Sequence, residues 1–130
     1  IESLGKVDIA FGGIGINGHL AFNEAEEVSA EEFATRTTRV LAISRETRVA
    51  NAIGDLNGAI DAMPIYAVTI GMKEILMANK IRLGVFRSWH RAVLRQAVFD
   101  DPSGHFPVTL IQNHRDALIL ANSEASKEAF

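Results

Sequence analysis

Cysteine is absent from this chain of 130 residues, and tryptophan and tyrosine occur only once each. The lack of cysteine excludes disulfides, thiolate metal ligands and cysteine nucleophiles together. No apolar run approaches the ~18 residues of a membrane-spanning helix, and the first residues lack the charged and then apolar pattern of a signal peptide. From these absences we expect no membrane partner and a cytoplasmic location.

Strong charge of one sign is also absent. Lysine and arginine number 13 against 16 aspartates and glutamates, which gives a formal net charge of −3. So small a charge offers no electrostatic footprint for nucleic acid. Hydrophobic residues make up 48% of the chain and charged residues 22%, a balance that is typical of globular proteins. We therefore expect one globular unit over residues 1–130 that does not bind nucleic acid.

Short apolar segments alternate with helical patterns along the chain. Segments that are rich in β-branched residues or bounded by glycine predict strands over residues 7–11, 37–43, 65–70, 81–86 and 117–121. Helices, two of them capped by Ser44 and Ser88, are expected over residues 44–53, 72–78, 88–99 and from 122 onward. This alternation predicts an α/β fold: a mainly parallel, Rossmann-like, three-layer sheet with helices on both faces. Because only six residues precede the first core strand, we expect an incomplete part of a larger domain.

The first predicted strand runs into a loop with four glycines among residues 12–18. Glycine allows sharp turns and the close approach of a ligand, and open α/β sheets bind ligands beyond the carboxyl ends of their strands. The spacing Gly13-x-Gly15-x-x-Gly18 formally matches the dinucleotide fingerprint. That fingerprint also needs a helix that begins within the glycines and an acidic residue at the end of the next strand. Neither pattern follows, so we disfavour a nicotinamide or flavin cofactor.

His19 closes this loop, with Asn17 before it and Glu24 after it. Either neighbour could fix the tautomer of the imidazole, and a carboxylate would raise its pKa and keep it active as an acid or base near neutrality. The alternative is a purely structural histidine. No Gly-x-Ser-x-Gly elbow supports a serine nucleophile. The other histidines are too far apart in the sequence to predict a metal site: His90, His105 and His114.

A third candidate lies where the strand over 81–86 meets the helix over 88–99. Backbone N–H groups at a helix start, together with Arg87 and Arg91, suit a phosphate or a carboxylate. The alternative is an ordinary surface helix with Arg91 and Arg95 exposed to solvent. The spacing of the residues does not decide between the two.

The glycine loop and its continuation resemble the signature of the glucosamine-6-phosphate deaminase/isomerase family. The family pattern Gly-Gly-(Ile/Val)-Gly-x-Asp-Gly-His-(Ile/Leu)-Ala-Phe-Asn-Glu is similar to Gly12-Gly13-Ile14-Gly15-Ile16-Asn17-Gly18-His19-Leu20-Ala21-Phe22-Asn23-Glu24. Further similar segments are 35–40, 47–51 and 64–71. The resemblance runs through essentially the whole chain and corresponds to the C-terminal half of a full-length member. It implies aldose–ketose isomerisation with amine release on an amino sugar phosphate, without a cofactor and together with the N-terminal half of the same protein.

The resemblance also implies roles for single residues. In the family the histidine of this signature opens the sugar ring, so His19 becomes the ring-opening acid/base, Glu24 its carboxylate partner and Asn17 its orienting neighbour. Arg91 falls where the family has a phosphate-binding lysine, and arginine keeps the charge while adding a bidentate fork. The expected substrate-binding residues are Gly13, Gly15, Gly18 and Arg91.

Two departures from the family pattern concern the expected chemistry. Asn17 replaces an aspartate, so it supplies no negative charge and should leave His19 less basic. Ile53 replaces a second phosphate-binding arginine, so recognition of a 6-phosphate should be weaker or use other groups. The family's enolisation base and first phosphate loop belong to its N-terminal half, and we therefore expect the isolated 130 residues to be inactive.

Two other functions remain open at this point. A 6-phosphogluconolactonase-like hydrolase has a similar Gly-Asp-Gly-His loop but lacks the Ala-Phe-Asn-Glu continuation. A non-catalytic sugar-phosphate sensor is favoured by Asn17 and Ile53. Within the enzyme hypothesis, a phosphorylated fructosamine is an alternative substrate. Family members range from monomers to hexamers, which leaves self-association of the chain open.

Overall fold

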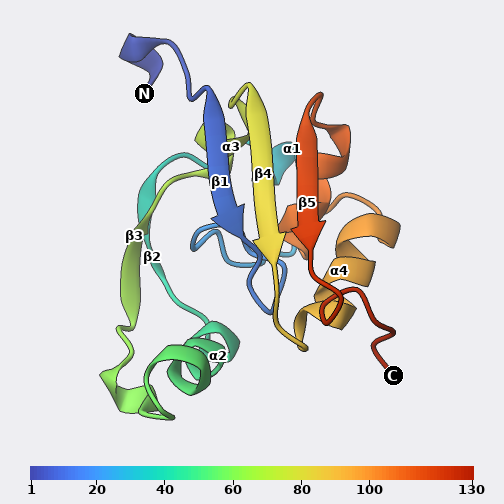
Figure 1. Cartoon of the computed structure of the whole chain (residues 1–130). Coiled ribbons are helices and arrows are strands. Elements are labelled where there is room, and N and C mark those ends of the chain that lie inside the picture. The colour runs from blue at the N-terminus through green and yellow to red at the C-terminus, as the bar shows by residue number, and fades with distance from the viewer.

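The chain folds into a parallel sheet of three strands and a separate antiparallel ribbon of two, in a computed structural model that describes all 130 residues (Figure 1). In the main sheet, β4 (Lys80–Val85) lies between β1 (Ile9–Gly13) and β5 (Ala117–Ala121). The ribbon pairs β2 (Arg39–Ala42) with β3 (Tyr66–Thr69). All five predicted strands are therefore present, and the fold is α/β with a mainly parallel sheet.

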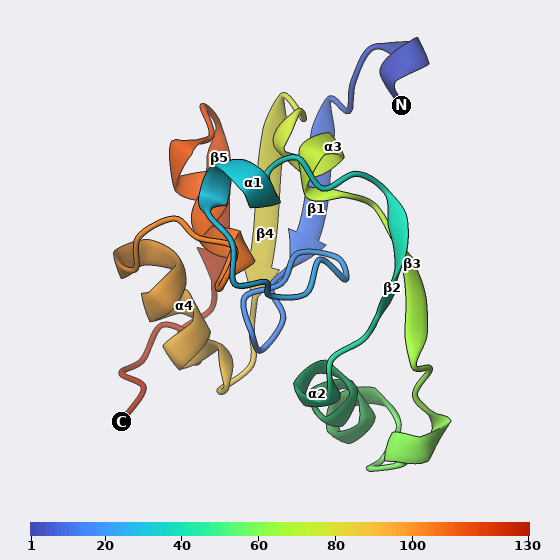
Figure 2. The ribbon, with the colours of Figure 1, turned by 180° about the vertical axis from the view of Figure 1, so that it is seen from behind.

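One face of the main sheet forms the hydrophobic core. Alternate residues of the central strand, Ile81, Leu83 and Val85, are no more than 3% exposed. They pack in one cluster with Met72 of α3 (Met72–Leu76) and Val93 of α4 (His90–Phe99). Figure 2 looks onto this face and shows α3, α4 and α1 (Ala30–Phe33) in front of the strands. The 3₁₀ segment Pro107–Asn113 adds further buried residues to the same core.

The opposite face of the main sheet, which Figure 1 looks onto, is not covered by helices. On this face the strand register places Arg82 between Phe11 and Leu118, and Gly84 beside Leu120. Phe11 is 81% exposed, and Leu118 and Leu120 are about half exposed. The helical layer that we expected on this second face is thus not formed by residues 1–130. A single-sided sheet agrees with the expectation of an incomplete part of a larger domain.

The predicted start of α2 (Arg45–Asp55) is confirmed. Ser44 is its N-cap, and the Ser44 hydroxyl accepts a hydrogen bond of 3.1 Å from the backbone N–H of Thr47. Such a cap satisfies one of the N–H groups that the first helical turn leaves unpaired. None of the helices combines the length and the apolar character needed to cross a membrane.

Two predicted helix starts are wrong. Ser88 caps nothing, because the ring of His90 accepts the Arg87 N–H at 3.1 Å and α4 begins only at His90. The segment after Asn122 makes a single turn instead of a helix, because the Asn122 side chain accepts the Ala125 N–H at 2.9 Å. In both cases a side chain takes a local backbone group and favours a turn.

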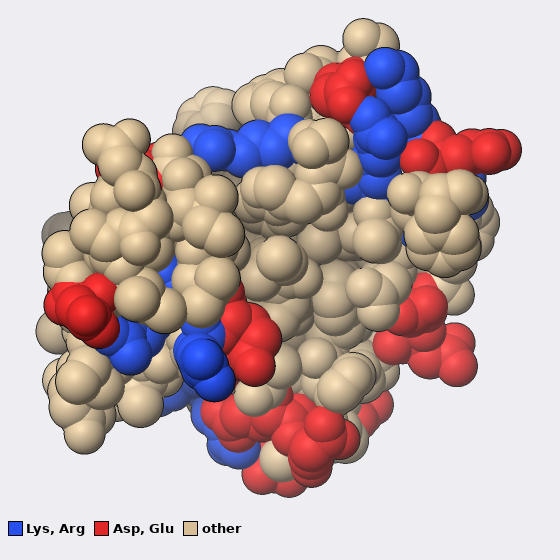
Figure 3. Space-filling model, turned by 90° about the horizontal axis from the view of Figure 1, so that it is seen from below, with Lys and Arg blue, Asp and Glu red and all other residues tan.

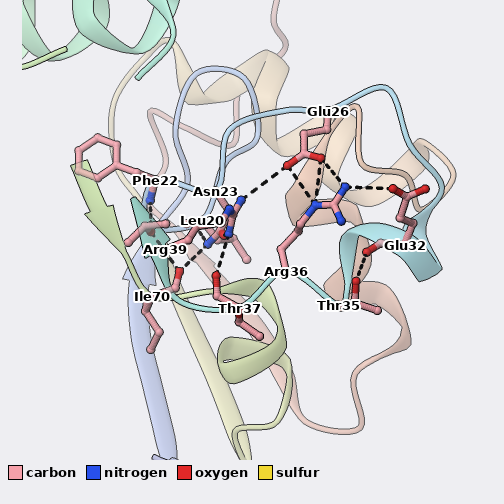
Figure 4. A network of polar contacts seen from close by, with 11 residues as sticks. Leu20, Phe22, Asn23, Glu26, Glu32, Thr35, Arg36, Thr37, Arg39 and Ile70 are labelled. Carbon is pink, nitrogen blue, oxygen red and sulfur yellow. Dashed lines mark hydrogen bonds and ion pairs between the residues drawn. The ribbon is translucent and has the colours of Figure 1, made fainter. Parts of the chain in front are cut away.

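The β2–β3 ribbon and α2 lie beside the β1 edge of the main sheet, and a polar network attaches the ribbon to it (Figures 1 and 4). Its centre is Asn23, which is fully buried and donates at 2.8 Å to the carbonyls of Leu20 and Ile70. The Asn23 side-chain oxygen accepts from Arg39 of β2, also at 2.8 Å. Next to it, Arg36 pairs with Glu26 and Glu32. Asn23 thus fixes the loop that carries His19 against the ribbon.

The bare sheet face should make the 130-residue chain self-associate, because an exposed apolar patch is driven out of water. We expect the double substitution Phe11→Ser and Leu120→Ser to lower concentration-dependent association several-fold, as measured by sedimentation equilibrium. Phe99→Ser is the matched control, since Phe99 is 77% exposed but lies on α4. Equal effects of the two substitutions would contradict an association through the sheet face.

Candidate active site

The glycine loop lies beyond the carboxyl end of β1 and lines a pocket of about 390 Å³. Glycines of β1, its following loop and β4 form one wall, and α2 and the turn before α4 face them. Figure 3 shows this end of the molecule, with mainly uncharged atoms in the middle and charged residues around them. The lining includes Gly13, Gly15, His19, Ala50, Arg87 and Trp89.

Asn17 contacts the His19 ring directly, and Glu24 in turn contacts Asn17. His19 Nδ1 lies 2.5 Å from Asn17 Oδ1, which also accepts the His19 backbone N–H at 3.3 Å. The Asn17 amide nitrogen donates to Glu24 Oε2 at 2.7 Å. Because an amide oxygen only accepts, the proton of the neutral ring lies on Nδ1. The hydrogen bonds of the ring all use Nδ1, and His19 lines the pocket, so the Nε2 lone pair is free to act there.

Glu24 joins the glycine loop to the start of α2. Its carboxylate accepts from Asn17, from the Thr47 hydroxyl at 3.1 Å and from the Ser44 N–H at 3.2 Å. The position at a helix N-terminus also favours a negative charge. Glu24 does not contact His19 directly: Oε2 lies 4.0 Å from Nδ1, with the Asn17 amide between them.

Burial lowers the pKa of His19 below its ordinary value, and the nearby Glu24 carboxylate opposes this shift without overcoming it. The His19 side chain is only 11% exposed, so the loss of hydration of the charged ring dominates. The expectation that a carboxylate neighbour would raise this pKa is therefore wrong in its net direction. At neutral pH the ring is uncharged and can accept a proton at Nε2.

Two of the loop glycines are required by close packing. A Cβ on Gly15 would lie 1.9 Å from His19 Cε1, so the imidazole lies directly on the Gly15 backbone. Gly18 has a φ of +77°, a left-handed conformation that glycine adopts readily, and a Cβ there would meet the Phe106 ring at 2.6 Å. Gly13 and Gly15 line the pocket, whereas Gly18 shapes the turn behind it.

His90 is a structural histidine that connects the two loops of the site. Its Nδ1 accepts the Arg87 N–H at 3.1 Å, which leaves the proton on Nε2 to be donated to the Ile14 carbonyl at 3.0 Å. Burial lowers the pKa of His90, chiefly by desolvation. Because both nitrogens are occupied, His90 fixes the turn before α4 against the glycine loop. The sequence around His90 does not predict this role, because Ile14 is distant from His90 along the chain.

The structure places Arg87, and not Arg91, in the lining of the pocket. The Arg91 side chain turns to the C-terminal segment, where Nε donates to the Glu124 carbonyl at 3.0 Å and the guanidinium pairs with the Glu124 carboxylate. Arg87 lies 3.5 Å from Asp55 at the end of α2. The phosphate-binding role of Arg91 stays a prediction.

A wider hollow adjoins the pocket and includes Ile53. It shares Ala50, Gly54, Arg87 and Trp89 with the lining of the first pocket and has a volume of about 830 Å³. Arg45, which sequence reasoning missed, also lines it. No three His, Asp or Glu side chains lie close enough together to hold a metal ion.

No protein-family model matches the chain, but individual proteins do. The glucosamine-6-phosphate deaminase of Pasteurella multocida is 33% identical over 129 residues, which cover 98% of this chain and 46% of that protein. A solved structure of a monomeric glucosamine-6-phosphate deaminase has a TM-score of 0.85 and 32% identity, over 96% of this chain and 49% of that one. The chain therefore matches the C-terminal half of glucosamine-6-phosphate deaminases. It spans about half the length of the curated relatives it matches.

A more distant likeness concerns the fold alone. The 6-phosphogluconolactonase of Leishmania guyanensis has a TM-score of 0.63 at 20% identity, over 94% of this chain and 41% of that protein. The resemblance to the deaminase family stated from the sequence is therefore confirmed, and the lactonases share the architecture of the sheet.

Gly15→Ala should displace the His19 ring, because the new methyl group would overlap it. We expect a destabilisation of about 1–3 kcal/mol, typical of overpacking, and a changed chemical shift of the His19 ring protons. Gly12→Ala is the matched control, since its Cβ would make an ordinary contact of 3.5 Å with Leu83. Denaturant unfolding and NMR measure the two effects. Equal tolerance of both substitutions would contradict the close packing of His19 on Gly15.

The free energy of unfolding should fall between pH 7.5 and pH 5.5. The pKa values of His19 and His90 are lowered in the folded chain, so the unfolded chain binds more protons below the ordinary histidine pKa of about 6.5. Urea unfolding at the two pH values measures the slope. His19→Gln should reduce this slope, because it removes one of the two groups whose pKa is lowered. A slope unaffected by His19→Gln would contradict the lowered pKa.

Proposed function

We propose that the chain is the C-terminal part of a sugar-phosphate isomerase/deaminase that acts on an amino sugar phosphate such as glucosamine 6-phosphate. The observation that carries this proposal is the arrangement of His19, Asn17 and Glu24, which leaves Nε2 of a neutral imidazole free toward the pocket. The relationship to glucosamine-6-phosphate deaminases over 98% of the chain supports it.

His19 would open the sugar ring in two proton transfers. Nε2 first accepts the proton of the anomeric hydroxyl, and the imidazolium then donates it to the ring oxygen as the bond between that oxygen and the anomeric carbon breaks. Both oxygens are bonded to the same carbon, so one group can serve them in turn. The Asn17 side-chain oxygen accepts a hydrogen bond from Nδ1–H throughout and keeps the ring in place. The products are the open-chain aldehyde and the unchanged histidine.

The rest of the reaction would rely on groups beyond these residues. Moving a proton between the first two carbons needs a base on the other side of the pocket, and we assign it to the remaining half of the full-length protein. The bare apolar face around Phe11 and Leu120 supports such a second half, because further helices would remove it from water. Arg87 or Arg91 would contribute to binding the phosphate.

Asn17 and the exposed Ile53 favour a second candidate, a sugar-phosphate sensor without turnover. Ile53 is 71% exposed beside the pocket and carries no charge for a phosphate. Asn17 supplies no charge to stabilise an imidazolium. A sensor would bind a sugar phosphate and release nothing.

Assays of the full-length protein separate these functions. We expect ammonia and a ketose phosphate from glucosamine 6-phosphate, or the corresponding amine from a phosphorylated fructosamine, and no acceleration of 6-phosphogluconolactone hydrolysis. His19→Gln should abolish the release. Binding measured by calorimetry without any turnover would support the sensor, and lactone hydrolysis alone would overturn the deaminase.

Asn17→Asp should raise the pKa of His19, because a negative charge would replace a neutral amide 2.5 Å from Nδ1. In the full-length protein we expect about tenfold faster ring opening and turnover near neutral pH, since the imidazolium becomes more stable. NMR titration of the His19 ring and steady-state kinetics measure the two effects. Asn17→Ser, which adds no charge, is the control. A lower pKa in the aspartate variant would refute this electrostatic account of Asn17.

A further inference from the structure

Thr47 lies behind His19, on the first turn of α2, and is only 1% exposed. Its hydroxyl oxygen is within reach of three polar atoms: Glu24 Oε2 at 3.1 Å, Ser44 Oγ at 3.0 Å and His19 Nδ1 at 3.3 Å. Asn17 and Glu24 lie near His19 in the sequence. Thr47 follows His19 by 28 residues, and only the tertiary structure brings its side chain into contact with the ring.

The hydrogen-bonding capacity of Thr47 determines the direction of each contact. A hydroxyl has one proton and two lone pairs. The Glu24 carboxylate only accepts, so it receives the Thr47 proton, and Ser44 donates to Thr47. The remaining lone pair then faces His19 Nδ1. Thr47 can therefore only accept from His19.

Nδ1 of His19 thus faces two acceptors, Asn17 Oδ1 and Thr47 Oγ1. If the proton were on Nε2, the Nδ1 lone pair would point at two oxygens with no proton between them. That arrangement is repulsive in a buried site. We propose that Thr47 is a positioning residue, whose hydroxyl keeps the proton of the neutral His19 ring on Nδ1 and the lone pair of Nε2 on the pocket side.

This role is separable from the helix cap. The cap bond runs from the Thr47 backbone N–H to Ser44 Oγ, so it does not use the Thr47 hydroxyl. Replacing threonine by valine keeps the shape and the backbone N–H and removes only the hydroxyl. Serine keeps the hydroxyl and removes only the methyl group.

The experiment compares Thr47→Val with Thr47→Ser in the full-length protein. In ¹⁵N-histidine NMR above the His19 pKa, the wild type and Thr47→Ser should carry the proton on Nδ1. In Thr47→Val the ratio of Nδ1–H to Nε2–H forms should fall about fivefold, the loss of one hydrogen bond. Thr47→Ala gives a second variant without the hydroxyl if valine impairs folding, which circular dichroism reports.

The kinetic part of the test rests on the proposed deaminase function. We expect Thr47→Val to lower kcat about tenfold with KM within about twofold, and Thr47→Ser to restore kcat. An unchanged tautomer ratio in Thr47→Val, or a serine variant as impaired as the valine variant, would overturn the proposal. The NMR result does not depend on turnover, so a full-length protein without deaminase activity refutes the proposed function and leaves the test of Thr47 intact.

Discussion

The largely buried carboxylate of Glu24 is the group on which the candidate site depends. Its side chain is 12% exposed, so its oxygens need hydrogen-bond donors from the protein. Those donors come from two parts of the chain: Asn17 in the glycine loop, and Ser44 and Thr47 at the start of α2. Because one anion serves both parts, the loop and the helix are held together, and His19 is oriented between them.

The neutral amide of Asn17 links Glu24 to His19 by hydrogen bonds and fixes the orientation of the ring, but it carries no charge of its own. It accepts from His19 on one side and donates to Glu24 on the other, so the imidazole is held in one tautomer while the nearest carboxylate oxygen stays 4.0 Å away. Burial then decides the protonation state and lowers the pKa of His19. The site therefore presents a neutral base to the pocket, and any imidazolium formed during a reaction has an amide as its direct neighbour.

The main sheet is covered by helices on one face only. One face is covered by α1, α3 and α4, whereas Phe11, Leu118 and Leu120 on the other face meet water. The chain also spans about half the length of the curated deaminases that it matches. Both observations agree with the proposal that the remaining half of the full-length protein covers this face and completes the site.

The sequence by itself determined the features that depend on neighbouring residues: five strands from β-branched runs, the Ser44 cap and the His19 loop with its family signature. The helix starts at Ser88 and after Asn122 were mispredicted because an imidazole nitrogen and one side-chain oxygen accept backbone N–H groups there. Only the tertiary structure decided the rest. It brought Thr47 to His19, turned Arg91 toward Glu124 and left Arg87 at the pocket. These outcomes depend on which distant groups share a buried space, and the spacing of residues along a chain does not contain that information.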